Sequence, residues 1–475
     1  MSKAKLFIES FLIYGLGGVL SKLIPLIMLP IITRLMPDTF YFGLNDLSVT
    51  VVSFGTAFAI MGMYDAMFRM FFEKDDEEYR KDICSSALGF TLLTSFIVFI
   101  ILIIFKNSIS KLIFSDVKYQ NLLFLTAMSI LIGATNSIVS APTRMNNKRT
   151  VFLITNTLSS LLSYTVSIPL LIKGYYVIAL PLASVLSALA IEIIFAILNR
   201  NWFQLKRVNW QYIKEMLAIG LPLLPNFLIY WIFSSSDRLM IAKMMGNEYT
   251  GIYAVGAKLG QVSQLIYTAF AGGWQYFAFS TMKEDDQVQS TSRIYEYLGV
   301  ISFVAGMFVA ALSKPIFYLL FNGDYVNGYT VAPYLFLAPL SQMLFQVASN
   351  QYLVIKKTWP NMLILSLGAV ANIALNLIFI PIIGIEGAAI ASLIGYIISN
   401  IVCILALTRI KLIKLSAKFL ITTGLLLVFF IIWRVVVDGN VVISLIMAIF
   451  ITLVYFYLYK KDLSRLIKVL KKGNN

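Results

Sequence analysis

The clearest candidate for chemistry is a stripe of polar residues within one long apolar segment, residues 250–280. Polar side chains recur there at helical spacing: Lys258, Gln261, Gln264, Thr268 and Gln275. At about 100° per residue, they would share one face of a helix. A polar stripe on a membrane helix must face a partner helix or a watery cavity, because lipid cannot hydrogen-bond it. Hydrogen bonds between helices would explain the stripe, but a lysine with no acid beside it in the segment favours a cavity.

Other polar residues lie deep in further apolar segments and are candidates for substrate contacts. Lys22 lies too far from the inner end of the first apolar segment to snorkel, which favours a cation facing a cavity. Gln342 lies in the segment 329–355, and Asn372 lies in the segment 361–382. Their amides could bind sugar hydroxyls, but contacts between helices would explain them equally well.

Charged residues near segment ends are candidates for ion pairs or gates. Asp65 and Arg69 are four residues apart, which suits an ion pair at the membrane interface or a guard at the cytoplasmic entrance. Asp237 and Arg238 are neighbours near the outer end of a later segment. Adjacent helical residues point about 100° apart, so this pair should need different partners, as a gate between two halves would provide. Arg34 is the expected equivalent near the end of the first segment.

The residue types exclude several kinds of chemistry. The chain contains no histidine, and its two cysteines, Cys84 and Cys403, lie far apart. Triads and metal sites that use histidine are therefore excluded, and neither a metal-binding spacing nor a disulfide framework is present. The connections between apolar segments are too short for an extramembrane catalytic domain. We expect no metal, no cofactor and no enzyme activity.

The segments that must position these residues are long enough to cross a membrane. The chain has 475 residues, of which 59% are hydrophobic and 13% charged, and its mean hydropathy is +0.83. This composition is typical of a polytopic membrane protein. The first segment follows a short leader without a cleavage site, so we expect it to be retained. By apolar length we predict an all-α fold with about fourteen spans, near 8–33, 43–68, 85–105, 120–142, 150–172, 175–198, 215–240, 250–280, 295–321, 329–355, 361–382, 385–407, 416–436 and 440–459.

The basic residues predict the orientation of these spans. The formal net charge is +15, which could suggest nucleic-acid binding. However, the lysines and arginines gather in the loops that share a side with the N-terminus, as cytoplasmic loops do. We therefore predict both termini in the cytoplasm and no nucleic-acid partner. The basic, amphipathic tail LSRLIKVLKKGNN is expected to lie on the anionic inner leaflet.

An internal repeat organises the chain. Residues 34–43 resemble residues 243–251, and residues 168–174 resemble residues 380–387, with both echoes offset by about 210 residues. Six helices lie within that offset, so the two copies should be parallel. Such a repeat is a common basis for alternating access in transporters. The predicted parts are an N-terminal six-helix lobe (1–208), a C-terminal six-helix lobe (209–410), two extra spans (411–460) and a basic cytoplasmic tail (461–475).

Four stretches together resemble a known family, the bacterial polysaccharide-repeat flippases of the multidrug/oligosaccharidyl-lipid/polysaccharide (MOP) exporter superfamily. They are LSKLIPLIMLPIITRLMPDTFYFG at 20–43, GLPLLPN to GAKLG at 220–260, LLFNGDYVNGYTVAPYLFLAPLSQ at 319–342 and ANIALNLIFIPIIGIEGAAIASLIGY at 371–396. The resemblance implies a fold like that of the MATE multidrug exporters, with alternating access between two lobes. It also implies that Lys258 matches a basic position of relatives and that Lys22 lies in a comparable part of the first span. A groove for a lipid tail at the last two spans is implied by the resemblance alone.

The resemblance implies export of undecaprenyl-diphosphate-linked oligosaccharide repeat units across the bacterial inner membrane, for surface polysaccharide such as O-antigen. Lys22 and Lys258, together with Arg144 or Arg149, would attract the diphosphate, while the amides would meet the sugars. Membrane lipids, a polysaccharide polymerase and a chain-length regulator are the expected partners. An ion-coupled multidrug exporter or another lipid-linked precursor flippase of the same superfamily is the alternative. A membrane polysaccharide polymerase is disfavoured by the short loops and missing histidine.

Overall fold

The computed structural model describes residues 23–472, apart from positions 281, 283, 358 and 438. The described chain is helical throughout and contains no strand, which confirms the all-α prediction. A short apolar helix, Leu23–Leu35, comes first. The next helices are α2 (Thr39–Ile60), α3 (Met63–Phe71), α4 (Glu77–Ile104), α5 (Lys106–Phe114), α6 (Gln120–Met145), α7 (Arg149–Ile172), α8 (Ala179–Leu198), α9 (Trp210–Gly220), α10 (Leu224–Trp231), α11 (Asp237–Met244) and α12 (Asn247–Gly260). They are followed by α13 (Ser263–Ser280), α14 (Gln287–Leu320), α15 (Ala332–Val354), α16 (Trp359–Ile383), α17 (Ile385–Arg409), α18 (Ala417–Ile431) and α19 (Val441–Lys472).

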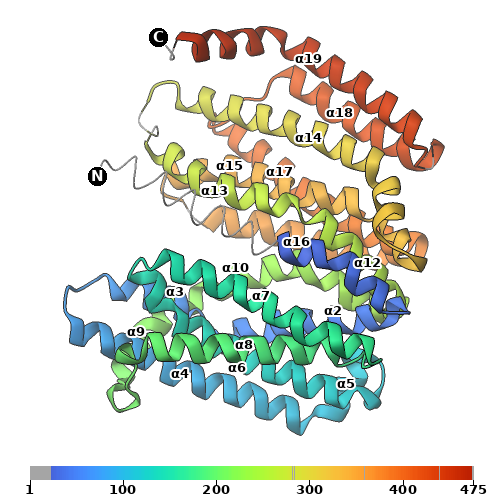
Figure 1. Ribbon diagram of the computed structural model, residues 1–475. Helices are drawn as coiled ribbons and strands as arrows, with labels where there is room; N and C mark the ends of the chain where they lie inside the picture. The colour runs from blue at the N-terminus through green and yellow to red at the C-terminus, as the bar shows by residue number, and fades with distance from the viewer. Residues whose placement is uncertain (1–22, 281, 283, 358, 438, 473–475) are drawn as a thin grey trace. The chain divides into compact units, whose positions relative to one another are not determined.

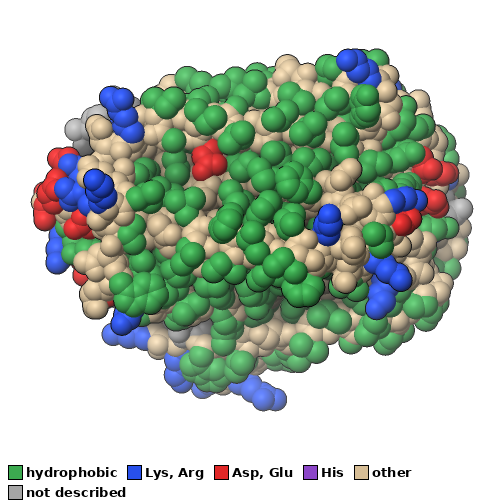
Figure 2. All heavy atoms as spheres, turned by 90° about the horizontal axis from the view of Figure 1, so that it is seen from below, with side chains coloured by type: hydrophobic (Ala, Val, Ile, Leu, Met, Phe, Trp, Pro, Cys, Tyr) green, Lys and Arg blue, Asp and Glu red, His purple; other side chains and the backbone are tan. Residues whose placement is uncertain are grey.

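Eleven helices of the described chain are long and apolar enough to cross a membrane, or twelve if the bent pair ending in α15 is one span. Two further predicted spans correspond to the short helix Leu23–Leu35 and to the broken pair α12 and α13. The exact number of fourteen stays a prediction. Figure 2 shows one face on which hydrophobic side chains fill the middle and most charged side chains lie at two opposite ends. This distribution suits a multi-pass membrane protein, because the apolar middle can face lipid.

The chain forms two compact units, one ending at Ala254 and the other beginning at Val255. In the first unit, the packed pairs are α4 with α6, α6 with α8, α7 with α8 and α2 with α6. In the second unit, the packed pairs are α14 with α15, α15 with α17, α16 with α17 and α13 with α15 (Figure 1). Each pair of the second unit is the counterpart, six predicted spans later, of a pair in the first. The helix packing therefore follows the repeat that the sequence echoes indicate.

The boundary between the compact units falls later in the chain than the predicted boundary between six-helix lobes at 208/209. The reason is that α9 packs against α3 and α4, and α11 packs against α2, all within the first unit. Compactness and repeat symmetry divide a chain by different criteria. The predicted lobes and tail therefore stay predictions.

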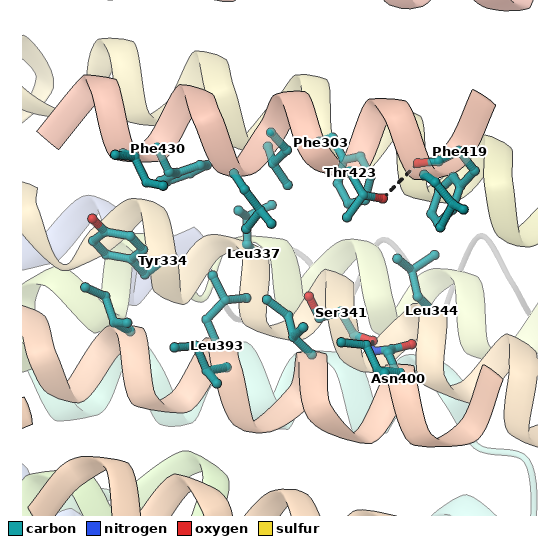
Figure 3. A pocket seen from close by; sticks show the side chains of 18 of the residues that line it. Phe303, Tyr334, Leu337, Ser341, Leu344, Leu393, Asn400, Phe419, Thr423 and Phe430 are labelled. Atoms are coloured by element: carbon teal, nitrogen blue, oxygen red, sulfur yellow. Dashed lines mark hydrogen bonds between the residues drawn. The ribbon is translucent and has the colours of Figure 1, made fainter. Parts of the chain in front are cut away.

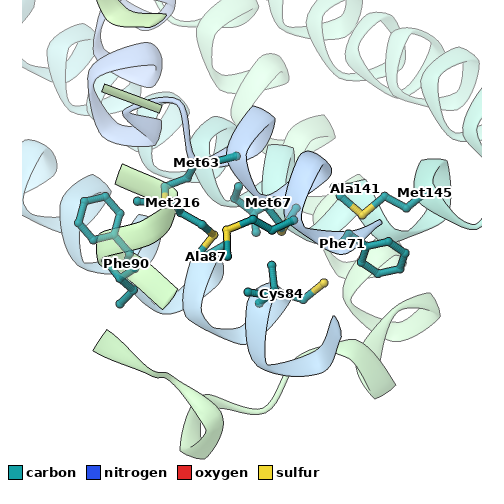
Figure 4. Close-up of a cluster of buried hydrophobic side chains, with 14 of the residues drawn as sticks. Met63, Met67, Phe71, Cys84, Ala87, Phe90, Ala141, Met145 and Met216 are labelled. Atoms are coloured by element: carbon teal, nitrogen blue, oxygen red, sulfur yellow. The ribbon is translucent and has the colours of Figure 1, made fainter. Parts of the chain in front are cut away.

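A methionine-rich core holds α3, α4, α6 and α9 together in the first unit (Figure 4). Met63, Met67, Cys84 and Met216 are fully buried in it. Methionine is unbranched and flexible, so it fills the irregular spaces where helices of different tilt meet. Cys84 is a packing residue of this core.

The echoed links pack against each other at two glycines. A Cβ atom on Gly43 would overlap the carbonyl oxygen of Asn247, and one on Gly251 would overlap that of Thr39. Asn247 precedes Gly251 by four residues, and Thr39 precedes Gly43 by four residues, so the two glycines make equivalent contacts. Small residues at a helix crossing let backbones approach closely. The similarity between residues 34–43 and 243–251 therefore reflects a shared packing role at the start of α2 and α12.

Candidate functional site

The predicted polar stripe does not lie on one continuous helix. Helix α12 ends at Gly260 and α13 begins at Ser263, with Gln261 in the turn between them. The prediction of a single helical face is therefore wrong, because angular spacing cannot be carried across the break. Lys258 and Gln261 are exposed and Gln264 is half-buried, whereas the side chain of Gln275 lies outside the described residues. Broken membrane helices often contribute to transport sites, so a substrate role for this segment stays a prediction.

The other predicted substrate residues divide between packing and exposure. Asn372 is fully buried and donates to Ser392 Oγ at 3.0 Å, which joins α16 to α17. It also accepts a hydrogen bond from Asn376 at 3.3 Å. These contacts match the alternative of bonding between helices, so they do not place Asn372 against a sugar. Gln342 is half-buried on α15. Lys22 lies outside the described residues.

The predicted gate residues divide into an exposed set and a buried pair. Arg34, Asp65 and Arg69 are exposed, and Asp65 forms no ion pair with Arg69 although the two share α3. Their spacing permitted a pair, but an exposed pair gains little free energy in water. The carboxyl group of Asp65 instead lies at the edge of a pocket described below.

Arg238 is the centre of a buried ionic network in the first unit. Its Nε atom donates to Asp46 Oδ2 at 2.6 Å, and its Nη1 atom lies 3.4 Å from Asp237 Oδ1. Tyr253 donates to Asp237, and Arg238 also donates to the carbonyl oxygen of Ser234. Ser234 belongs to a short π-helix, Ile232–Ser236, which widens the helix just before this arginine. Arg238 and Asp237 thus have different main partners, Asp46 and Tyr253, as expected, and their own contact joins them in one network; a gate role stays a prediction.

A polar pocket of about 580 Å³ opens in the first unit between α2, α3, α6, α7 and α10. Arg144 Nη1 donates to the Tyr64 hydroxyl at 2.7 Å, and its guanidinium lies 5.0 Å from the centre of the Phe152 ring. Thr56 Oγ1 and Asn136 Oδ1 are buried there without a hydrogen-bond partner among the described residues. Buried polar atoms are nearly always satisfied, so these two oxygens indicate a place for a polar ligand. We call this site the polar pocket.

An apolar groove of about 950 Å³ runs through the second unit between α14, α15, α17 and α18 (Figure 3). Figure 3 shows Phe303, Leu337, Leu344, Leu393 and Phe430 projecting into the space between these helices. Leucine, isoleucine and phenylalanine side chains make up most of its lining. We call this site the apolar groove.

The few polar groups of the apolar groove bond to one another. Arg434 Nε donates to both carboxylate oxygens of Glu386, at 2.8 and 2.7 Å, and Tyr334 donates to the same carboxylate at 3.0 Å. Farther along, Asn400 accepts from Tyr295 at 3.2 Å and donates to the Ser341 carbonyl oxygen at 2.9 Å. Because these groups pair within the protein, the groove presents a mainly hydrocarbon surface to an occupant.

Sequence reasoning missed both sites as assembled units. The sequence indicates Arg144 only as a single cation, whereas its neighbours Thr56, Tyr64 and Phe152 come from α2, α3 and α7. In the groove, Glu386 and Arg434 are 48 positions apart and meet only through folding. The one available signal was the presence of charged residues in apolar segments, which are costly unless paired.

Comparisons with known proteins agree with this architecture. A family model described as "Polysaccharide biosynthesis protein" matches residues 31–327, which is more than half of the chain. No curated protein matches the sequence significantly.

Solved structures share the fold at low sequence identity. Lipid II flippase MurJ, in an inward closed conformation, is 17% identical, with a TM-score of 0.71 over 95% of this chain and 99% of that one. An inward-facing multidrug resistance MATE family transporter of the MOP superfamily is 14% identical, with a TM-score of 0.63 over 84% of this chain and 94% of that one. A MOP superfamily transporter from Pyrococcus furiosus is also 14% identical, with a TM-score of 0.58 over 85% of this chain and 95% of that one. The chain therefore belongs to the polysaccharide biosynthesis protein family and has the transporter fold that MurJ and the MATE proteins share.

Proposed function

We propose that this protein is a flippase that moves undecaprenyl-diphosphate-linked oligosaccharide repeat units across the bacterial inner membrane by alternating access. The observation that carries the proposal is the apolar groove, a cavity of about 950 Å³ with a mainly hydrocarbon lining inside a transporter fold. A substrate with a long isoprenoid chain can bury its hydrocarbon against such a lining, which burial of apolar surface favours. Family membership points in the same direction, because lipid-linked sugars are the precursors of surface polysaccharide.

The polar end of this substrate cannot cross hydrocarbon unaided. The polar pocket offers one arginine, Arg144, two buried unpartnered oxygens and several hydroxyl groups, with the carboxyl group of Asp65 also in its lining. Arg144 would attract the diphosphate, while Thr56 and Asn136 would hydrogen-bond to sugar hydroxyls. By the predicted orientation, the pocket lies in the cytoplasmic half of the membrane, where the substrate would be loaded. Lys258 at the break between α12 and α13, and Lys22, remain proposed further contacts for the diphosphate.

The structural likenesses support the proposal at the level of the fold. The MurJ likeness covers 95% of the chain, compared with 84% for the MATE transporter. This larger share is consistent with the predicted fourteen spans. MurJ itself is described as a lipid II flippase, and flipping of a lipid-linked substrate is proposed for this chain as well. A polymerase and a chain-length regulator are its proposed functional partners.

The experiment is depletion of the protein in its host, with lipid-linked repeat units and surface polysaccharide measured together. We expect the lipid-linked unit to accumulate on the cytoplasmic side while the polymer disappears. Normal surface polysaccharide under complete depletion would contradict the proposal. An unchanged polysaccharide accompanied by new drug sensitivity would instead favour a multidrug exporter.

The groove is tested by filling it. Leu393 projects into the groove, so Leu393→Trp should obstruct an isoprenoid chain and lower flipping about tenfold or more, as a steric block at a binding site does. Ile382→Trp is the matched control, because Ile382 on α16 is 72% exposed and does not line the groove. Flipping is measured with the purified variants in liposomes that contain a labelled polyprenyl-diphosphate saccharide. Equal rates for both variants would remove the groove from the proposal.

A further inference from the structure

A third pocket, of about 620 Å³, lies in the second unit where α14 begins, α17 passes into α18, and α19 approaches its end. Three basic and four acidic residues line it: Arg293, Lys414, Lys418, Asp285, Asp286, Glu296 and Asp462. By the predicted orientation it faces the cytoplasmic leaflet. We call it the charged pocket.

The frame of the charged pocket is fixed by hydrogen bonds. The buried carboxylate of Glu296 accepts from the backbone N–H of Ser416 at 2.6 Å and from its hydroxyl at 2.8 Å. Tyr459 of α19 donates to the same carboxylate at 3.2 Å. The backbone N–H of Lys414 donates to Ser292 Oγ at 2.9 Å. These bonds join α14, the loop before α18, and α19, so the pocket is built by the fold and not by a chance arrangement of loops.

Some of the charged side chains that line the pocket form ion pairs with each other, and others do not. Lys418 pairs with Asp462 at 3.3 Å and lies over the Tyr459 ring. Within the described residues, the ammonium group of Lys414 and the guanidinium of Arg293 enter none of the ion pairs. Asp285 and Asp286 are exposed acidic residues of the same pocket, and neither forms an ion pair with a described residue, although Asp286 Oδ2 accepts a hydrogen bond from the Ser290 hydroxyl at 3.2 Å. Two cations and two carboxylates therefore remain for a ligand.

The charged pocket adjoins the apolar groove. Leu415 lines both sites, and the neighbouring residues Tyr295 and Glu296 on α14 line one site each. A molecule with a charged headgroup in the pocket thus has an apolar path beside it for a hydrocarbon chain. An amphiphile is the class of ligand that uses both surfaces.

We propose that the charged pocket binds the headgroup of a zwitterionic aminophospholipid, such as phosphatidylethanolamine. Arg293 and Lys414 bind its phosphate, and Asp285 and Asp286 accept hydrogen bonds from its ammonium group. A diphosphate suits the pocket less well, because the two aspartates repel it. A choline headgroup cannot donate hydrogen bonds to them, and an anionic glycerol headgroup brings no positive charge. This lipid site does not depend on the proposed flipping of a saccharide.

The experiment measures lipid retained by the purified full-length protein with native mass spectrometry. Phosphatidylethanolamine, phosphatidylcholine and phosphatidylglycerol with identical acyl chains are added at equal concentrations. We expect the ethanolamine lipid to bind about fivefold more strongly than the choline lipid, as two exposed charge contacts allow. Equal binding of these two lipids, or stronger binding of phosphatidylglycerol, would overturn the proposal.

Two double variants test the acidic and the basic residues of the charged pocket separately. Asp285→Asn with Asp286→Asn should remove the preference for ethanolamine over choline, whereas Arg293→Gln with Lys414→Gln should weaken both lipids alike. The matched controls are Glu284→Gln and Lys411→Gln, exposed charges next to the pocket that do not line it. All of these side chains are exposed, so the variants should fold, which size-exclusion profiles check. Loss of the preference in Glu284→Gln, or its survival in the aspartate double variant, refutes the assignment.

Discussion

Replacing Arg238 with glutamine should be among the most destabilising polar substitutions in the first unit. The side chains of Arg238 and Asp46 are 9% and 6% exposed, and their ionic contact is 2.6 Å long. Removing one partner of a buried ion pair leaves an uncompensated charge, which typically costs about 3–5 kcal/mol. Here two carboxylates, Asp46 and Asp237, lose the same cation. We therefore expect a loss near the upper end of that range.

The assay is equilibrium unfolding of the purified protein in mixed micelles, followed by circular dichroism while the denaturing detergent is increased. If Arg238→Gln does not fold, Arg238→Lys keeps the charge but not the planar fork of donors, and it should unfold at an intermediate midpoint. The control Lys118→Gln breaks an ion pair whose side chains are 65% and 47% exposed, and it should leave the midpoint unchanged.

A double variant distinguishes ionic pairing from loss of packing. Asp46→Asn neutralises the carboxylate that Arg238 leaves behind, so combining it with Arg238→Gln should recover part of the stability, with a coupling of about 2 kcal/mol. A cost below about 1 kcal/mol for Arg238→Gln, or strictly additive effects, would refute the reasoning, since a buried network must couple its members.

Three further predictions follow from the packing. Gly251→Ala should destabilise the protein or abolish its folding, because the new Cβ would overlap the Thr39 carbonyl oxygen. In the control Gly424→Ala on α18, the new Cβ meets nothing within 4 Å, so this variant should be more stable by up to about 1 kcal/mol. Denaturation midpoints compare the two variants. Glu296→Ala should leave the Ser416 N–H and hydroxyl unpaired, which should cost about 2–3 kcal/mol of stability and speed amide hydrogen exchange at the start of α18. The control Glu284→Ala should change neither the stability nor the exchange. Unchanged exchange in both variants would argue that Glu296 does not hold the start of α18. Cys84 and Cys403 are each 0% exposed, so a maleimide should label them only after denaturation, and rapid labelling of the native protein would contradict this packing.

The sequence by itself determined the class of the protein and the order of its helices. Apolar length is a local property, and a bilayer requires backbone hydrogen bonds to be satisfied within each helix, so each span could be recognised separately. The echo between residues 34–43 and 243–251 also carried real structural information. Gly43 and Gly251 recur because both helix starts need a backbone without a Cβ at one crossing.

Only the tertiary structure decided which polar residues meet. Arg238 and Asp46 are 192 positions apart, and no local pattern distinguishes that pairing from a gate between lobes. The break between Gly260 and Ser263 contains no proline, so periodicity alone predicted a continuous helix through Lys258. The polar pocket combines Tyr64, Arg144 and residues of three other helices, and the apolar groove needs α18 beside α15 and α17. Such sites depend on where helices lie in space, because a side chain's partners across a helix interface are set by packing and not by position along the chain.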